Sequence, residues 1–161
     1  MMGINAEQLR LKIIRPVLEH LDSEIPYSIA AENLVMGTCA QESDMGLYIV
    51  QRENGPAQGI FQMEPATEMD IMQNFLIYRA NLEIAINLLV NEFCPDDMSS
   101  LTGNMYYAAA MCRVHYYRVP EGLPMSDDIE GLAHYYKQHY NTYKGKATVD
   151  DFIQNYNRYV I

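Results

Sequence analysis

The sequence predicts a mainly α-helical protein in which residues 1–161 form a single domain, with a loop-rich lobe and one minor short strand. Apolar residues recur at intervals of three and four along nearly the whole chain, which is the period of a helix packed on a core. No internal repeat, heptad run or low-complexity linker interrupts this pattern. With 161 residues, 49% of them hydrophobic, the chain can bury one sizeable core and is too short for two ordinary domains.

The first predicted helix begins after Asn5, which suits an N-cap with Gln8 as its return partner. Pro16 lies inside this helix and is expected to kink it, because proline has no N–H to donate. The apolar positions of the helix are four residues apart, at Leu9, Ile13, Val17 and Leu21.

The second predicted helix begins at Tyr27-Ser28 and runs toward Glu42. The segment from Ser43 to Gly59 follows as loop, with the short strand at Leu47–Val50. This segment is the expected loop-rich lobe.

Five more helices are expected after the lobe, at Pro65–Tyr78, Asn81–Asn91, Asn104–Tyr117, Ser126–Gly145 and Thr148–Val160. Proline suits the first turn of the helix that begins at Pro65, and Cys94-Pro95 ends the next one. Ser126 is the expected cap of its helix, with two aspartates favourably placed in the first turn. The inner face of that helix is predicted to hold Ile129, Leu132, Ala133, Tyr136 and Tyr143.

The charge of the chain argues against nucleic acid as a partner. Eleven Lys and Arg stand against 21 Asp and Glu, which gives a formal net charge of −10. A nucleic-acid-binding surface needs a basic patch, and this composition has no such electrostatic footprint.

The cysteines and the termini indicate synthesis in a reducing compartment. Cys39, Cys94 and Cys112 are odd in number and lie in apolar surroundings, which favours reduced core thiols over a disulfide framework. Met1–Leu21 carries charges and no cleavage signature, so we do not expect a signal peptide. The longest apolar stretch, Ile84–Val90, is too short to cross a bilayer, so no membrane span is expected.

The most informative motif lies between Ala40 and Thr67. Glu42-Ser43 is followed, after a loop, by Gly59-Ile60-Phe61-Gln62 and then by Pro65-Ala66-Thr67. In this order and spacing the motif resembles that of the soluble lytic transglycosylase and goose-type lysozyme family: Glu-Ser, a loop, Gly-hydrophobic-hydrophobic-Gln, then Pro-Ala-Thr. The resemblance implies a lysozyme-like fold that cleaves peptidoglycan glycan strands with no cofactor and no metal.

Glu42 is the expected catalytic residue. Cleaving a glycosidic bond near neutral pH needs a carboxylic acid that is still protonated, so its pKa must be raised. An apolar wall, the nearby charge of Asp44 and the negative end of the helix would each raise the pKa of Glu42.

Four further residues of the motif are expected around the substrate. The resemblance implies that Ser43 lies near the catalytic acid and that Gln62 lines the sugar groove. Gly59 would let the backbone approach closely, and Phe61 or Ile60 would pack beneath the turn. The amide of Gln62 offers both a donor and an acceptor to N-acetyl sugars.

The chain departs from the family at a later motif, Ala-Tyr-Asn-Ala-Gly, whose Tyr reaches the catalytic Glu. Here Met111 stands where that Tyr is expected. Tyr107, one helical turn earlier, or Tyr116 can substitute for it. The recurrence of Tyr136 and Tyr140 at helical spacing is more typical of helix packing than of sugar binding.

The number of acids distinguishes two mechanisms. Most glycosidases pair two carboxylates, and this chain offers four candidates for the second one: Asp44, Glu53, Glu64 and Glu68. The resembling transglycosylases use one Glu, which protonates the leaving oxygen and then deprotonates the muramic C6 hydroxyl. A single well-placed acid favours that route. Cys112 and His115, although three residues apart, lack the spacing of a metal site.

We therefore expect a phage-encoded lytic transglycosylase that cuts the β-1,4 bond between N-acetylmuramic acid and N-acetylglucosamine. Its partners would be peptidoglycan and other virion proteins, and it would reside in the virion or in the host cytoplasm before delivery to the wall. Two alternatives stay open: a virion structural or adaptor protein with an inactive lysozyme-like fold, and a muramidase with a second carboxylate. The charge of −10 and Met111 favour the adaptor. An unrelated helical binding module would require the motif to be accidental.

Overall fold

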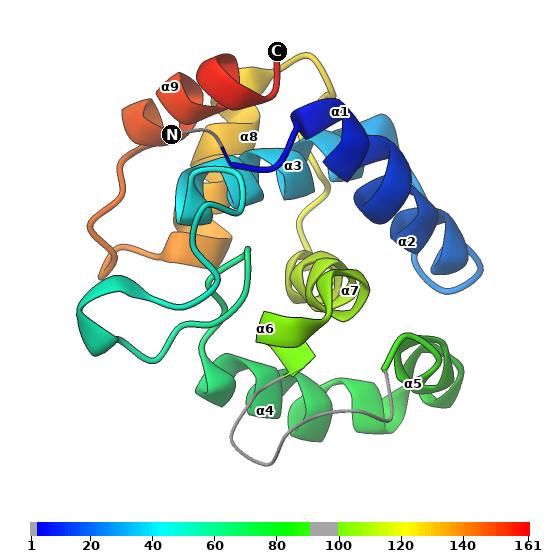
Figure 1. Cartoon of the computed structure of the whole chain (residues 1–161). Helices are drawn as coiled ribbons and strands as arrows, with labels where there is room; N and C mark the ends of the chain where they lie inside the picture. Colours follow the sequence, from blue (N-terminus) through cyan, green and yellow to red (C-terminus); the bar gives the residue numbers. More distant parts are fainter. Residues whose placement is uncertain (1–2, 91–99) are drawn as a thin grey trace.

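The computed structural model describes residues 3–90 and 100–161, and these residues form a mainly helical structure around one core, as predicted (Figure 1). The chain passes through α1 (Ala6–Leu9), α2 (Arg15–His20), α3 (Ile29–Ser43), α4 (Pro65–Asn74), α5 (Ala80–Asn87), α6 (Ser100–Gly103), α7 (Met105–Tyr117), α8 (Ile129–Tyr136) and α9 (Val149–Tyr159). Short 3-10 turns lie at Arg52–Asn54 and Leu76–Tyr78, and π-helical turns at Arg10–Ile14 and Lys137–Asn141.

The first helical segment confirms the predicted N-cap, but no return bond from the Gln8 side chain to Asn5 forms among the described residues. The Asn5 side chain accepts a hydrogen bond from the Gln8 backbone N–H at 3.0 Å. Between α1 and α2 the helix widens into the π-turn Arg10–Ile14, directly before the Arg15-Pro16 start of α2. Proline cannot donate the usual backbone hydrogen bond, so the irregular turn is the local consequence of Pro16.

Helices α3 and α7 form the centre of the molecule. Residues Leu34 to Ala40 are all buried, and so is the run from Tyr107 to Val114. Gly37 lets α3 approach α9 closely, because a Cβ there would collide with the Phe152 ring. Ser28 caps α3, where the sequence suggested that this helix begins, and Asn104 caps α7; each accepts a hydrogen bond from a backbone N–H three residues on.

The eighth helix differs from its prediction at both ends. Asp128, and not Ser126, is the cap, since its side chain accepts from the Gly131 N–H at 2.8 Å. The regular helix ends at Tyr136 and continues as the π-turn Lys137–Asn141, so it does not run on to Gly145. Tyr143 lies beyond that turn and is 85% exposed, which removes it from the predicted inner face.

Other element boundaries are close to expectation. The predicted helix from Pro65 ends at Asn74 and gives way to a 3-10 turn that reaches Tyr78. Within the described residues, the short strand expected at Leu47–Val50 is reduced to single bridges, Val50 with Gln58 and Gln58 with Met63. The predicted helix end at Asn91, its stop at Cys94-Pro95 and the thiol of Cys94 lie outside the described residues.

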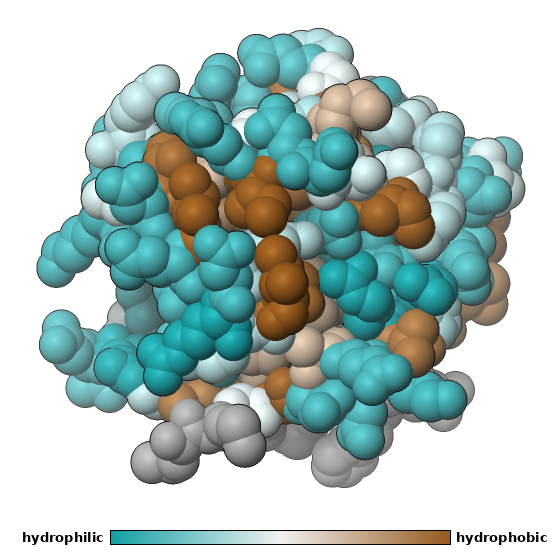
Figure 2. Space-filling model, turned by 90° about the horizontal axis from the view of Figure 1, so that it is seen from above, coloured by the Kyte–Doolittle hydropathy of each residue, from teal (hydrophilic) through white to brown (hydrophobic). Residues whose placement is uncertain are grey.

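The surface is mixed in character. Figure 2, which views the molecule from above Figure 1, shows a mainly hydrophilic face with hydrophobic side chains in small separate groups. No helix within residues 3–90 or 100–161 combines the length and apolar character needed to cross a bilayer. Cys39 and Cys112 are buried free thiols.

Candidate active site

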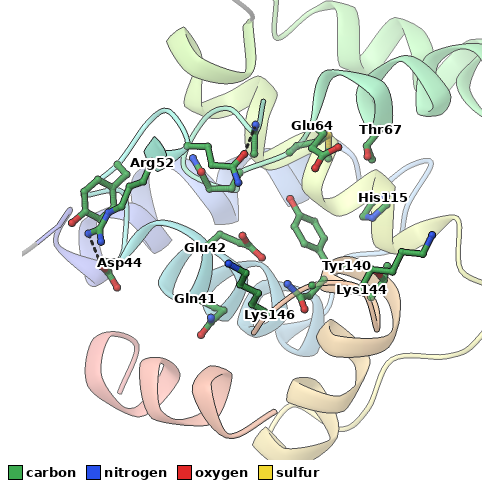
Figure 3. A pocket seen from close by; sticks show the side chains of 18 residues that line it. Gln41, Glu42, Asp44, Arg52, Glu64, Thr67, His115, Tyr140, Lys144 and Lys146 are labelled. Atoms are coloured by element: carbon green, nitrogen blue, oxygen red, sulfur yellow. Dashed lines mark hydrogen bonds and ion pairs between the residues drawn. The ribbon is translucent and has the colours of Figure 1, made fainter. Parts of the chain in front are cut away.

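A cavity of about 710 Å³ opens between the end of α3, the 44–67 segment and the 140–146 segment. Carboxylates, amides and three cationic side chains line it, which gives it a polar wall. Its lining residues are Gln41, Glu42, Asp44, Tyr48, Gln51, Arg52, Ala57, Gln62, Met63, Glu64, Thr67, His115, Tyr140, Asn141, Thr142, Lys144, Gly145 and Lys146. In Figure 3 the Glu42 side chain points into this space, with Asp44 and Arg52 on one side and Tyr140 on the other.

Glu42 lies in the last turn of α3, where the free carbonyls of the helix face the same end. Burial raises the pKa of Glu42 to about 7, and a hydrogen bond from the Tyr136 hydroxyl acts in the opposite direction. That hydroxyl donates to Glu42 Oε1 at 2.6 Å. No cation pairs with Glu42 among the described residues. The predicted rise of the pKa is therefore confirmed, with burial as its cause, and the group is partly protonated at neutral pH.

The tyrosine that contacts Glu42 is one that the sequence argument assigned to helix packing. Tyr136 comes from α8, and burial raises its pKa, so its hydroxyl remains a donor at neutral pH. Its ring also packs against Phe152, with ring centroids 4.9 Å apart. Its position on the predicted inner face was a usable signal, but nothing in the local sequence linked it to a residue on another helix.

The two tyrosines proposed as substitutes do not reach Glu42. The Tyr107 hydroxyl donates to Glu68 Oε1 at 2.7 Å, and the Tyr116 hydroxyl lies 2.7 Å from Thr38 Oγ1. Both side chains are buried, and neither lines this cavity. The prediction that they line the groove is therefore wrong, because their hydroxyls bond to Glu68 and Thr38 instead.

Ser43 holds the end of α3 against the glycine turn. Its hydroxyl lies 2.6 Å from the Ile60 carbonyl oxygen and 3.0 Å from that of Cys39, and it accepts from the Gly46 N–H at 2.8 Å. The side chain is 1% exposed. It is next to Glu42, as the resemblance implied, but it positions backbone and cannot touch a ligand in the cavity.

The turn Gly59–Gln62 is a tight loop closed by paired backbone hydrogen bonds between Gln58 and Met63, 2.9 and 3.1 Å long. Gly59 has φ +75° and lies against the Leu101 carbonyl, where a Cβ would collide. Its close approach is thus to Leu101, and not to a substrate. Phe61 is 1% exposed and belongs to the core, so it packs beneath the turn and does not line the cavity.

Gln62 is the residue of the turn that reaches the cavity. It has φ +47°, an uncommon conformation for a residue with a side chain. The Gln62 Nε2 donates to the Gly59 carbonyl oxygen at 2.8 Å, which leaves the Gln62 side-chain oxygen to accept from a ligand. Tyr140 supports the same turn from the other side, since its hydroxyl donates to the Phe61 carbonyl oxygen at 2.7 Å.

Two further carboxylates line the cavity. Asp44 faces Arg52, with 3.9 Å between Oδ2 and the guanidinium nitrogen, and Glu64 lies on the wall that carries Thr67 (Figure 3). Of the four candidates for a second carboxylate, Glu53 and Glu68 do not line the cavity. Glu68 instead accepts from Tyr107.

One histidine and two lysines also line the cavity. Burial, together with the neighbouring Arg118, lowers the pKa of His115 to about 4, so His115 is neutral at pH 7. Lys144 and Lys146 come from the segment after the π-turn Lys137–Asn141. Among the described residues, no group of three His, Cys, Asp or Glu side chains is placed to hold a metal ion.

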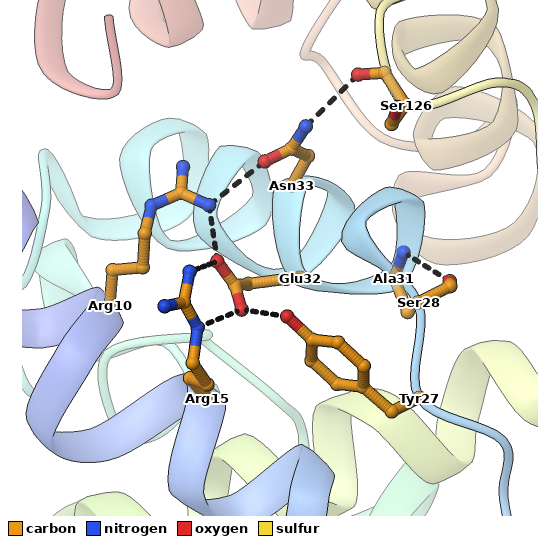
Figure 4. Close-up of polar contacts among 8 residues, drawn as sticks. All are labelled: Arg10, Arg15, Tyr27, Ser28, Ala31, Glu32, Asn33 and Ser126. Carbon is orange, nitrogen blue, oxygen red and sulfur yellow. Dashed lines mark hydrogen bonds and ion pairs between the residues drawn. The ribbon is translucent and has the colours of Figure 1, made fainter.

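A second carboxylate on the same helix, Glu32, has the opposite environment (Figure 4). Its side chain is 0% exposed and accepts from Arg10 at 2.6 Å, from Arg15 at 2.9 and 3.0 Å, and from the Tyr27 hydroxyl at 2.8 Å. Burial alone would raise the pKa of Glu32, but the hydrogen bonds from Arg15, Arg10 and Tyr27 outweigh it and hold the pKa at about 2. Glu32 is thus ionised and structural.

Comparisons with known proteins assign no family to this chain. A scan against models of protein families, a search of curated proteins and a search of solved structures each gave no significant match.

Proposed function

We propose that the protein is a lytic transglycosylase that cuts the β-1,4 bond between N-acetylmuramic acid and N-acetylglucosamine in peptidoglycan. The observation that carries the proposal is Glu42, a carboxyl group that has no cationic partner among the described residues, lines the 710 Å³ cavity and has a pKa of about 7. A group with such a pKa can give and take a proton near neutral pH, which is what general acid–base catalysis requires.

The two oxygens of Glu42 have different surroundings, and this suits the proposed route. Oε1 accepts from Tyr136, whereas Oε2 receives no hydrogen bond from a described residue and can carry the proton to the leaving sugar oxygen. The resulting carboxylate then takes the proton of the muramic C6 hydroxyl, which attacks the anomeric carbon and closes a 1,6-anhydro ring. Gln62 would hold an N-acetyl sugar through its free side-chain oxygen.

The wider setting of the proposal rests on sequence alone. A phage-encoded protein, with other virion proteins as partners, accounts for a wall-cleaving motif in a chain of net charge −10 with buried free thiols. Delivery as part of a virion would reduce the need to approach the anionic wall by free diffusion.

One observation favours a second candidate, a muramidase. Glu64 lines the same cavity as Glu42, and a second carboxylate can activate a water for hydrolysis. Hydrolysis leaves a reducing end, whereas transglycosylation leaves 1,6-anhydromuramic acid, which is one water lighter.

The test is digestion of purified peptidoglycan with analysis of the soluble fragments by mass. We expect anhydro ends from the parent protein and from Glu64→Gln, and a loss of cleavage on the order of 10²- to 10⁴-fold in Glu42→Gln. Reducing ends, together with loss of activity in Glu64→Gln, would establish the muramidase. Absence of cleavage by the parent under all conditions would leave the inactive adaptor.

A further inference from the structure

A second cavity, about 450 Å³, shares no lining residue with the cavity at Glu42. It is bounded by the segment that enters α3, the second half of α7, the 119–123 segment and α8. The residues that line it are Pro26, Tyr27, Ser28, Arg113, Tyr116, Tyr117, Val119, Pro120, Glu121, Gly122, Leu123 and Tyr135. Aromatic and aliphatic groups therefore form most of its wall, with one arginine among them.

Arg113 is the unusual member of this set, because it is only 6% exposed. Its guanidinium makes no hydrogen bond or ion pair with a described residue, and the guanidinium carbon lies 5.7 Å from the centre of the Tyr117 ring. Every fully buried side-chain nitrogen in the described part of the chain has a hydrogen-bond partner. The unpartnered nitrogens of Arg113 must therefore open onto the cavity that it lines.

Other buried or half-buried arginines in the protein have carboxylate partners. Arg10 and Arg15 bind Glu32, and Arg118 binds Asp70 at 2.6 Å. Arg113 has no equivalent, although burying a guanidinium without an anion is unfavourable. Burial lowers the pKa of Arg113, but an arginine starts so high that it stays charged at pH 7.

The groups around Arg113 do not neutralise it. Burial raises the pKa of Cys112 and of Tyr135, so both are uncharged at pH 7. Glu121 lies at the rim, where its carboxylate is 59% exposed and faces His139 at 3.2 Å. The cavity thus combines one buried positive charge with apolar walls, and a carboxylate at its rim disfavours a doubly charged ligand.

We propose that this cavity is a binding site for a monocarboxylate with an apolar or aromatic body, with Arg113 holding the carboxylate through paired N–H donors. The planar fork of a guanidinium matches a carboxylate in this way. The walls formed by Tyr117, Tyr135 and Pro120 cover the apolar body. The proposal does not depend on the glycosidase activity of Glu42.

The test uses N-acetylphenylalanine as the probe and its neutral amide as the matched control, with binding measured by calorimetry at pH 7. We expect the acid to bind on the order of tenfold more tightly than the amide, the difference of one charge-assisted pair. Equal affinities, or no binding of the acid at millimolar concentration, overturn the proposal. Tighter binding of phenyl phosphate than of the acid also overturns it.

Variants of Arg113 separate a binding role from a structural one. Arg113→Met removes an unpartnered buried charge, so we expect a melting temperature that is unchanged or higher and no binding of the acid. Arg113→Lys keeps the charge without the fork and should bind more weakly than the parent. A lower melting temperature in Arg113→Met, or binding retained there, contradicts the proposal. Arg79→Met, at an exposed arginine over the Phe75 ring, is the control that should change neither quantity.

Two sources can supply such a carboxylate, and a pair of probes distinguishes them. Tighter binding of the peptide Ala-Ala-Phe than of N-acetylphenylalanine identifies a polypeptide C-terminus as the ligand. Equal binding identifies a free organic acid. Both results support a carboxylate site at Arg113.

Discussion

Glu32 and Glu42 lie on the same helix, α3, and both are shielded from bulk water, yet their pKa values move in opposite directions. Glu32 has a pKa of about 2 and Glu42 a pKa of about 7. Desolvation raises the pKa in both cases. The difference comes from the partners, since Glu32 receives two guanidinium groups and a phenol, whereas Glu42 receives one phenol.

The comparison separates a carboxylate that stabilises the fold from one that is available for chemistry. The hydrogen bonds to Glu32 more than offset the cost of burying its charge, so Glu32 is ionised in the folded state at neutral pH. Glu42 has burial without charge compensation, which is an unfavourable state for an ionised group and a suitable one for a proton donor.

The largest effect on stability is expected for Glu32→Gln. The substitution leaves Arg10 and Arg15 without their carboxylate, and breaking a buried pair in this way typically costs about 3–5 kcal/mol. Because those arginines keep 21% and 36% side-chain exposure, we expect a loss of unfolding free energy near the lower end, about 3 kcal/mol at pH 7.

The stabilisation that Glu32 provides should depend on pH. The folded pKa of Glu32 is lowered, so its contribution is present above the unfolded pKa and is lost as the pH falls toward about 2. Parent and variant should therefore converge in denaturant titrations at low pH. Glu83→Gln, at an exposed site on α5, is the control and should change little. An undiminished difference at pH 2 would argue against the ion-pair account.

The second substitution, Glu42→Gln, is expected to raise the stability of the protein. The folded pKa of Glu42 is raised to about 7, so its ionised form destabilises the fold, and stability falls as pH rises from the unfolded pKa through about 7. Glu42→Gln keeps an acceptor for Tyr136 and removes the charge. Each pKa unit is worth about 1.4 kcal/mol, and because Glu42 is partly exposed to the cavity we expect a gain of about 2 kcal/mol at pH 8.

This gain should disappear below the unfolded pKa, where Glu42 is protonated in both states. Thermal unfolding of parent and variant at pH 4 and pH 8 measures it. Glu64→Gln is the matched control, because Glu64 lines the same cavity but is exposed. A variant that is less stable than the parent at pH 8 would contradict the prediction.

The helices and the environment of Glu42 could be read from the sequence, because both depend on local patterns. Asn5, Ser28 and Asn104 act as caps through neighbouring backbone N–H groups, and helical periodicity placed Glu42 near the end of α3. Ser126 was chosen over Asp128 because Ser, Asp and Asn are almost equally good caps, and the sequence does not say which one begins the turn.

The contacts made across the fold were beyond a local reading. Tyr136 reaches Glu42 from α8, and the choice between Tyr107, Tyr116 and Tyr136 depends on how α7 and α8 pack against α3. Gly59 was correctly singled out as a close-approach residue, but what it approaches is the Leu101 backbone. A motif identifies residues with special geometry more reliably than it identifies what they touch.

The smallest of the three effects is expected for Tyr136→Phe. Among the described residues, the Tyr136 hydroxyl is the one hydrogen-bond partner of the Glu42 side chain. Its hydrogen bond favours the ionised form, so Tyr136→Phe should move the pKa of Glu42 further above about 7. The titration of the Glu42 side-chain carboxyl, followed by carbon NMR, measures this directly and does not depend on any activity. If the protein cleaves peptidoglycan, the alkaline fall of its cleavage rate should move to higher pH with the carboxyl titration.

Tyr140→Phe is the control, because the Tyr140 hydroxyl donates to the Phe61 carbonyl and not to Glu42. A pKa that falls in Tyr136→Phe would mean that water enters the space left by the hydroxyl and that burial, the main cause of the raised pKa, is weaker than the structure indicates.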